Sequence, residues 1–67
     1  MKSNINVWIA KSGMSKKEVA KRMGVSQQVL SRWINNHSKP SLEKAFKLAD
    51  LLGCKVDDLY YWSEDDK

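Results

Sequence analysis

The sequence lacks the covalent and metal cross-links on which many small domains depend. Its 67 residues include one cysteine, Cys54, and one histidine, His37. A single cysteine cannot form an internal disulfide, and no Cys/His cluster is present to hold a metal. A chain of this length therefore depends on efficient packing or on a partner. We expect a buried or half-buried thiol at Cys54, and neither a metal nor another cofactor.

Long apolar runs and catalytic motifs are also missing. No stretch approaches the roughly 20 apolar residues that cross a bilayer, and the first residues lack the apolar segment of a signal peptide. No nucleophile, base and acid occur as a set, and there is no glycine-rich phosphate loop. We therefore expect a cytoplasmic protein with no membrane association, no enzymatic activity and no evident small-molecule ligand.

Acidic residues are scarce over most of the chain. From Met1 to Lys47 there are ten Lys or Arg residues against two acidic ones, whereas from Leu48 to Lys67 there are two lysines against six acidic residues. A basic body of this kind suits a polyanionic partner such as nucleic acid. A solvated, lysine-rich surface explains the same composition equally well, so charge alone does not decide between the two.

What the sequence does contain is a regular series of helix boundaries. Serine or asparagine residues that can cap a helix precede the apolar segments, and glycine follows most of them. Helices are expected after Ser3 or Asn4 up to Gly13, between Ser15 and Gly24, from Gln27 to about Asn35, from Ser41 to Leu52 and, as a short turn or fifth helix, over Asp57–Trp62. No segment alternates with a period of two, so we predict an all-α fold, a compact five-helix bundle over residues 3–62 with a flexible acidic tail over residues 63–67.

Side-chain spacing adds detail to these helices. Ser15 and Glu18 are spaced as a capping box, in which each side chain accepts a hydrogen bond from the other's backbone N–H. Trp8 and Trp33 recur at helical spacing with other apolar residues and are expected in the core. The apolar residues of the fourth helix are Leu42, Ala45, Phe46, Leu48, Ala49 and Leu52.

Only three residues, Gly24, Val25 and Ser26, separate the second helix from the third. So short a connection does not let the helices fold back antiparallel, and they must cross steeply. Gly24 can adopt a positive φ, Val25 can fill the corner, and Ser26 can cap the following helix. This arrangement predicts a helix-turn-helix unit, whose second helix can enter a major groove.

The third helix has a polar side without acidic groups. A rotation of about 100° per residue turns Ser26, Val29, Leu30 and Trp33 inward. The polar residues that fall together on the opposite side are Gln27, Gln28, Ser31, Arg32 and Asn35. Amide and guanidinium groups read base edges, glutamine pairing with adenine and arginine with guanine. The alternative is the ordinary polar surface of an amphipathic helix.

The stretches Gly13–Ser26, Leu30–Asn35, Pro40–Leu42 and Leu48–Gly53 together resemble the Cro-like (XRE) helix-turn-helix family of phage repressors. The resemblance runs from Ile5 to Leu59, with glycine, cap and core positions in step. It implies a lambda-repressor-like fold and sequence-specific binding of double-stranded DNA by a phage or bacterial transcriptional regulator, in the first instance a repressor. The recognition helix, residues 27–35, would lie in the major groove.

The resemblance also implies two kinds of DNA contact. Gln27, Gln28 and Arg32 would touch bases, and side-chain chemistry adds Ser31 and, at the edge of the core, Val29. The residues expected to contact or attract phosphates are Lys16, Lys17, Ser26, Asn35, Asn36, Ser38 and Lys39. Helix N-termini and lysines both favour phosphate, so the expectation has a physical basis.

Two positions depart from the resembled family. Asn36 stands where glycine is usual and must therefore adopt the left-handed conformation, which asparagine tolerates better than most residues. Ile34 replaces a typically acidic residue at the border between core and solvent. Its side chain either covers core surface or touches a partner.

The aromatic segment Tyr60, Tyr61 and Trp62 predicts a protein interface. Three adjacent aromatic residues cannot all face one core, and exposed aromatic residues suit a protein partner. The resembled family commonly dimerises to read two half-sites about 34 Å apart, so we expect a homodimer on a palindromic operator. The alternatives are an antirepressor or adaptor that binds a protein through Ile34 and this segment, and an antitoxin that binds both DNA and a toxin.

Overall fold

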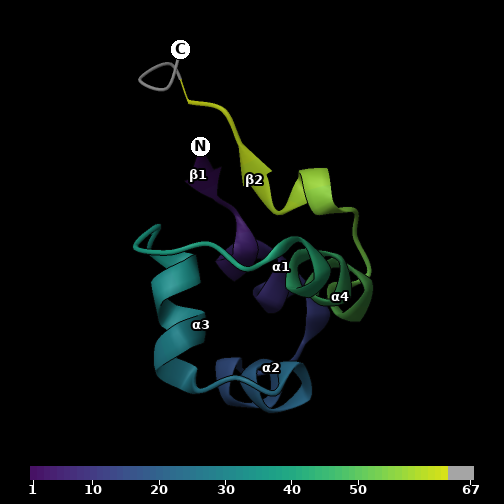
Figure 1. Cartoon of the computed structure of the whole chain (residues 1–67). Helices are drawn as coiled ribbons and strands as arrows, with labels where there is room; N and C mark the ends of the chain where they lie inside the picture. The colour runs from purple at the N-terminus through teal and green to yellow at the C-terminus, as the bar shows by residue number, and fades with distance from the viewer. Residues whose placement is uncertain (64–67) are drawn as a thin grey trace.

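Four α-helices make up most of residues 1–63, the part of the chain that the computed structural model describes. They are α1 (Ile5–Ser12), α2 (Lys16–Met23), α3 (Gln27–Ile34) and α4 (Leu42–Leu52) (Figure 1). A 3-10 turn, η1 (Val56–Asp58), leads from α4 into strand β2 (Tyr60–Tyr61), which pairs with strand β1 (Lys2–Ser3). The expected acidic tail lies outside the described residues apart from Ser63.

Serine caps begin three of the helices, as the sequence predicts. The hydroxyl oxygens of Ser15, Ser26 and Ser41 accept hydrogen bonds from the backbone N–H three residues later, at 3.1, 3.1 and 3.3 Å. Each such cap satisfies a donor of the first turn and contributes about 1 kcal/mol. Only half of the predicted capping box forms at Ser15, because the Glu18 carboxylate accepts from Arg22 Nε at 2.8 Å instead.

Residues in the left-handed conformation end α2 and α3 in the same way. Gly24 (φ 72°) ends α2, and the following Val25 N–H donates back into the last helical turn at 3.0 Å. Asn36 (φ 64°) ends α3, and the His37 N–H donates to the Arg32 carbonyl at 2.9 Å. This six-to-one bond is the closing bond of a Schellman motif, whose left-handed residue is usually glycine. The predicted conformation of Asn36 is confirmed.

The fifth helix expected over Asp57–Trp62 is reduced to the single turn η1, and the fold is not purely α-helical. The chain then extends as β2, antiparallel to β1, with Lys2 opposite Tyr61 and the Asn4 N–H donating to the Leu59 carbonyl at 2.8 Å. Aromatic residues favour the extended conformation, and a strand of two residues is too short to show a period of two in the sequence. The predicted helical class holds for most of the described chain, the fifth helix is not formed, and the pairing adds a two-stranded sheet.

One side of each α-helix builds the core, which the segment after η1 closes. Ile5, Val19, Leu30, Leu48 and Leu59 are fully buried. Complete burial of side chains of this size contributes about 1.5–3 kcal/mol each. These five residues come from α1, α2, α3, α4 and the residue before β2, so the core joins the four helices to the segment that follows η1.

The two predicted core tryptophans differ in their surroundings. Trp33 is 4% exposed and belongs to the core, as expected. Trp8 is half-buried against the core, and its indole N–H donates to the Asp58 carbonyl at 3.0 Å. The Lys11 ammonium lies 4.6 Å from the centroid of the Trp8 ring. Trp8 therefore ties α1 to η1 with a polar contact at the rim of the core.

The apolar stripe of α4 is wider than the part of it that is buried. Ala45, Leu48 and Ala49 face the core, whereas Leu42 is 71% and Phe46 60% exposed. The buried residues of α4 span an arc of about 100°, and Leu42 lies about 20° and Phe46 about 60° beyond one edge of it. Two of the apolar residues of this helix are thus left on the surface.

Cys54 follows α4 as a half-buried free thiol, as the sequence predicts. Burial, and then the nearby negative charge of Asp58, raise the pKa of this thiol. The group is therefore protonated and weakly nucleophilic at neutral pH.

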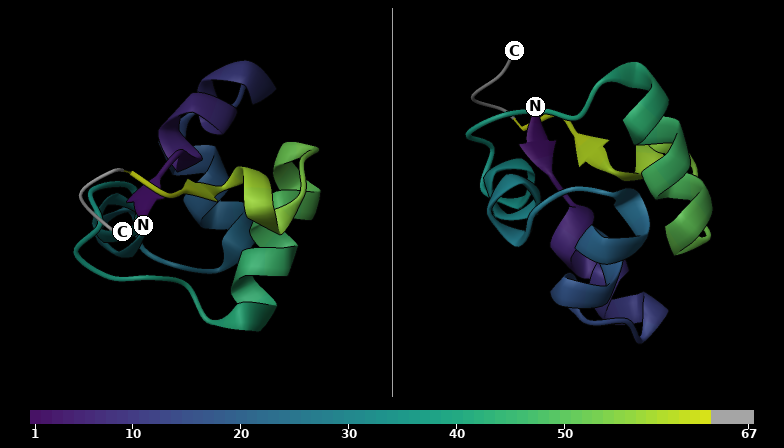
Figure 2. Two further views of the ribbon diagram at one scale, coloured as in Figure 1. Left: turned by 90° about the horizontal axis from the view of Figure 1, so that it is seen from above. Right: turned by 60° about the horizontal axis from the view of Figure 1, so that its bottom comes forward.

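The strand pairing brings the N-terminal residues beside the segment that follows η1. Both views of Figure 2 show β1 and β2 next to one another, and Figure 1 shows them at the end of the molecule opposite α2.

Within residues 1–63, no helix has the length and apolar character needed to cross a membrane.

The conformation of Asn36 generates a stability prediction. Asn36→Ala should lower the free energy of unfolding by about 1 kcal/mol, because alanine tolerates a positive φ less well than asparagine. Asn36→Gly should be at least as stable as the parent protein, because glycine adopts this conformation without strain. Urea denaturation monitored by circular dichroism measures both changes, and equal losses in the two variants would contradict the conformational explanation.

Candidate nucleic-acid interface

The link between α2 and α3 sets the direction of the candidate recognition helix. Gly24 supplies the left-handed turn, Val25 packs half-buried against the core, and Ser26 caps α3. The two helices consequently cross at a steep angle, with α3 along one side of the molecule (Figure 1). This is the geometry that the short connection predicts.

The side of α3 that faces the core is apolar. Leu30 is fully buried and Trp33 nearly so, and Ile34 packs half-buried against the same cluster. Of the two roles open for Ile34, covering the core is therefore the one that the structure supports. These contacts fix the rotation of α3 about its axis.

The opposite side of α3 is open to solvent. Gln27, Gln28, Arg32 and Asn35 are exposed, as the rotation about the helix axis predicts. Ser31, also predicted to face outward, is half-buried. Val29, predicted to turn inward, is 36% exposed and lies at the border of the polar side. Ser26 is exposed rather than inward-facing, with its hydroxyl engaged in the helix cap.

Donor groups dominate this exposed side. From Ser26 to Lys39 the sequence contains no Asp or Glu. Amides present both donors and acceptors, and the Arg32 guanidinium presents five donors in a fixed plane. Such a set matches the pattern of acceptors and donors on base edges in a major groove.

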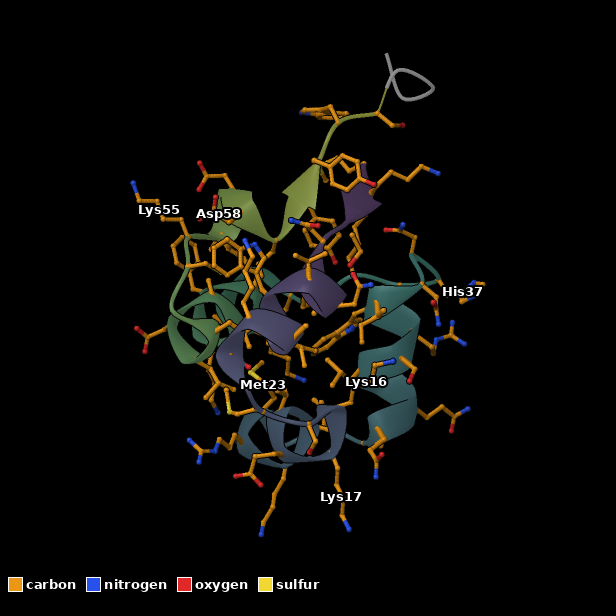
Figure 3. All side chains as sticks on the ribbon, turned by 180° about the vertical axis from the view of Figure 1, so that it is seen from behind. Lys16, Lys17, Met23, His37, Lys55 and Asp58 are labelled. Atoms are coloured by element: carbon orange, nitrogen blue, oxygen red, sulfur yellow. The ribbon has the colours of Figure 1, made fainter. Side chains whose placement is uncertain are left out.

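The start of α2 adds positive charge near this side. Lys16 and Lys17 are the first two residues of α2 and both are exposed. Figure 3 shows the Lys16 side chain extending in the direction of α3, whereas Lys17 points away from the body beyond α2. The backbone N–H groups of a first helical turn also attract anions. Lys16 is therefore the better placed of the two for a phosphate beside α3.

The loop after α3 continues the basic surface. Its first turn is fixed by hydrogen bonds from the backbone N–H groups of His37 and Ser38 to the Arg32 carbonyl, at 2.9 and 3.3 Å. Asn36, His37 and Lys39 are exposed, and Ser38 is half-buried. Figure 3 shows His37 at the C-terminal end of α3. The loop is thus held in place by α3 itself.

Arg22 is paired with a carboxylate, so it offers less positive charge to a ligand than the lysines of α2 do. Its Nε donates to Glu18 Oε1 at 2.8 Å, one turn earlier on the helix. This hydrogen bond, and then the positive charge of Arg22, lower the pKa of the Glu18 carboxyl below its ordinary value. The pair is exposed, so its contribution to stability is small.

The three aromatic residues expected at a protein interface lie on and after β2. Tyr61 and Trp62 are 51% and 67% exposed, which agrees with the expectation that at least one must face solvent. Tyr60 is half-buried, and burial raises the pKa of its phenol. Its hydroxyl oxygen is buried and has no hydrogen-bond partner within residues 1–63.

The sequence does not mark Leu42 and Phe46 as surface residues. Their spacing, one helical turn apart, matches that of the buried residues of α4, so the sequence alone carries no signal that separates them. Only the position of α4 against the rest of the core shows which apolar residues stay uncovered.

Comparisons with known proteins agree with this geometry. A family model described as helix-turn-helix matches residues 8–59. An uncharacterized HTH-type transcriptional regulator of Methanocaldococcus jannaschii is 30% identical over 66 residues, covering 98% of this chain and 100% of the relative. A similarly named protein of Archaeoglobus fulgidus is 30% identical, with coverage of 98% and 93%. The crystal structure of a candidate DNA-binding protein from Bacteroides fragilis has a TM-score of 0.79 and 34% identity, covering 87% of this chain and 94% of that one.

The pairing of Glu18 with Arg22 generates a prediction for pH dependence. The Glu18 pKa should lie below that of an unpaired glutamate, and Arg22→Gln should return it to the ordinary range. Because the folded-state pKa is the lower one, the pair stabilises the fold above the unfolded-state pKa, and this contribution disappears as the pH falls through the folded-state pKa. Carboxyl chemical shifts followed by NMR against pH measure the effect. An unchanged Glu18 titration in Arg22→Gln would exclude the pair in solution.

Proposed function

Because this chain belongs to the helix-turn-helix family of DNA-binding transcriptional regulators, we propose that it is a sequence-specific regulator, and in the first instance a repressor. In this proposal α3 enters the major groove of a double-stranded operator. The family consists of DNA-binding regulators rather than enzymes, and chromosomal DNA as the target implies a cytoplasmic protein.

The observation that carries the proposal is the exposed, acid-free side of α3. Leu30 and Trp33 hold the helix against the core, so its other side is presented without any need to rearrange. A surface that carried carboxylates would repel phosphates and could not donate to the acceptor atoms on base edges. The absence of Asp and Glu from Ser26 to Lys39 removes that obstacle.

We assign base contacts to the residues on this side of α3. Gln27 and Gln28, at the start of the helix, would pair with adenine edges, and Arg32 would pair with the O6 and N7 atoms of guanine. Because Ser31 is half-buried, only the hydroxyl at the end of its side chain would reach a base. Val29, partly exposed, would contact a thymine methyl group.

Phosphate contacts would fix the position of α3 in the groove. The residues assigned to them are Lys16, Lys17, Ser26, Asn35, Asn36, Ser38 and Lys39. They come from three places, namely the start of α2, the cap of α3 and the loop after α3. Contacts on both sides of a groove set the register without reading sequence themselves.

We further propose that two copies bind a palindromic operator. Two half-sites about one helical turn, roughly 34 Å, apart would require two α3 helices related by a two-fold axis. The exposed Tyr61 and Trp62, together with Tyr60, supply an apolar segment for the contact between the copies.

The first test is to select an operator from a random duplex library and to measure binding at rising salt. A regulator should prefer selected duplexes over unrelated ones at every salt concentration. Salt-sensitive binding without any sequence preference would instead favour a protein-binding adaptor built on the same fold, because phosphate contacts alone produce only such binding.

Arg32→Ala tests base recognition. We expect it to weaken operator binding by about 1–3 kcal/mol and to relax the preference at one base position, since the bidentate contact to guanine is lost. Fluorescence anisotropy with the operator and its single-base variants measures both effects. Unchanged affinity and unchanged preference would show that Arg32 does not read a base.

Lys39→Ala tests the phosphate contact of the loop after α3. It should weaken binding to all duplexes alike and reduce the slope of log K against log salt by about one. Lys11→Ala is the matched control, because Lys11 is an exposed lysine of α1, outside the helix-turn-helix unit and outside the contacts assigned above. Equal losses in the two variants would indicate a general charge effect and remove the assignment.

A further inference from the structure

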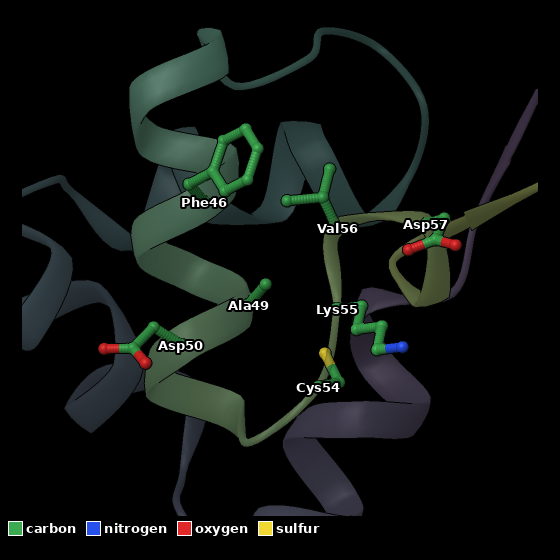
Figure 4. A pocket seen from close by; sticks show the side chains of 7 residues that line it. All are labelled: Phe46, Ala49, Asp50, Cys54, Lys55, Val56 and Asp57. Atoms are coloured by element: carbon green, nitrogen blue, oxygen red, sulfur yellow. The ribbon is translucent and has the colours of Figure 1, made fainter.

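A hollow lies between α4 and the segment that leads into η1. Its volume is about 450 Å³, and its apolar lining comes from Phe46, Ala49, Cys54 and Val56 (Figure 4). Phe46 stands at its edge with 60% of the residue exposed. One patch of surface therefore carries both a protruding ring and a recess.

A second hollow continues from the first toward β2. Its volume is about 410 Å³, and Met1, Tyr60, Tyr61 and Trp62 line it. Val56 and Asp57 belong to both hollows, so the two are adjoining parts of one surface. We call this the α4–β2 surface and define it by the exposed apolar residues at the two hollows, Phe46, Met1, Tyr61 and Trp62, together with Leu42, which lines neither hollow but lies one helical turn before Phe46 on α4.

The area of the α4–β2 surface fits one half of a stable protein interface. Its exposed residues range from 39% exposure at Met1 to 71% at Leu42, which corresponds to on the order of 500 Å² of apolar surface. This area is comparable to the largest apolar patch of a typical monomer, about 300–600 Å². A standard interface buries about 800 Å² on each partner, and polar residues at the rim supply the area that the apolar residues do not.

We propose that a second copy of this chain covers the whole α4–β2 surface, so that α4, through Leu42 and Phe46, forms the dimer interface together with the aromatic segment. The inference rests on the homodimer of the proposed function and extends it to residues that the sequence does not mark as interfacial. Each copy would insert Phe46 into the hollow of the other.

The shape of the surface favours a second copy over another partner. A two-fold interface brings the same patch of both subunits together, so each feature must meet its complement within that one patch. Phe46 and the adjoining hollow satisfy this condition. An unrelated partner does not require the ring and the recess to occur side by side.

The charge of the surface points the same way. Asp50, Lys55 and Asp57 border the first hollow, so both signs are present within a few residues. By contrast, the stretch from Ser26 to Lys39 is basic with no acidic residue. Two copies facing one another through the basic side would repel, whereas acidic and basic groups at the mixed rim can pair across the two-fold axis.

The test compares Phe46→Glu and Leu42→Glu with the parent protein by sedimentation velocity from low to high micromolar concentration. The parent should dimerise, and each substitution should raise the dimer dissociation constant about a hundredfold, because a two-fold axis makes every change occur twice. Val7→Glu is the matched control, since Val7 is 40% exposed and lies on α1, outside the α4–β2 surface. Its dissociation constant should equal that of the parent.

The single cysteine locates the contact independently. Alkylation of Cys54 by a maleimide should slow as the concentration of the parent protein rises, because dimerisation covers the first hollow, and should be independent of concentration in Phe46→Glu. A parent protein that stays monomeric, α4 variants that dimerise normally, or a Cys54 rate unaffected by dimerisation would each overturn the inference. Circular dichroism spectra matching that of the parent confirm that the variants fold.

A duplex with one half-site separates this inference from the proposed function. Phe46→Glu should bind a single half-site as the parent does and should lose the affinity gained from the second half-site of a full operator. If the parent itself binds neither duplex specifically, the proposed function fails while the sedimentation result stands. If half-site binding is normal and dimerisation does not depend on α4, only the present inference fails.

Discussion

The packing of Leu30 and Trp33 against the other helices is the constraint on which the rest of the molecule depends. A helix of eight residues such as α3 is too short to persist alone in water, because nucleation of a helix is unfavourable and few hydrogen bonds follow it. Burial of these two side chains supplies the missing stability and also fixes the rotation of the helix. The backbone of α3 is therefore fixed in advance, and only the exposed side chains on its polar side need ordering to meet a partner.

Local sequence signals predicted the helical part of the fold well, since caps and left-handed residues act within a few residues of chain. Ser26 and Asn36 do what their positions indicate at the two ends of α3. The pairing of β1 with β2 was not predictable in this way, because it depends on contacts between the two ends of the described chain. The exposure of Phe46 escaped prediction for a related reason, since a regular apolar stripe does not reveal how much of it the rest of the core can cover.

The rotation of residues about the helix axis predicted which side of α3 is exposed, but it did not define the borders of that side. The exposure of Gln27, Gln28 and Arg32 follows from a turn of about 100° per residue, whereas Val29 and Ser31 lie near the border where that rule assigns sides poorly. Which base or phosphate each side chain meets depends on the groove and on the angle of docking, and neither is encoded in the periodicity of a single chain. The assignments of individual contacts therefore stay predictions.

The pairing of β1 with β2 has a kinetic and thermodynamic consequence. It is the contact with the greatest separation along the chain, so its loop-closure entropy is the largest, and the sheet should form after the helices have collapsed. Two strands of two residues also form a local unit that can open without global unfolding. Since Tyr61 and Met1 belong to this region, any partner that covers them would also hold the two ends of the domain closed, and association and local order would rise together.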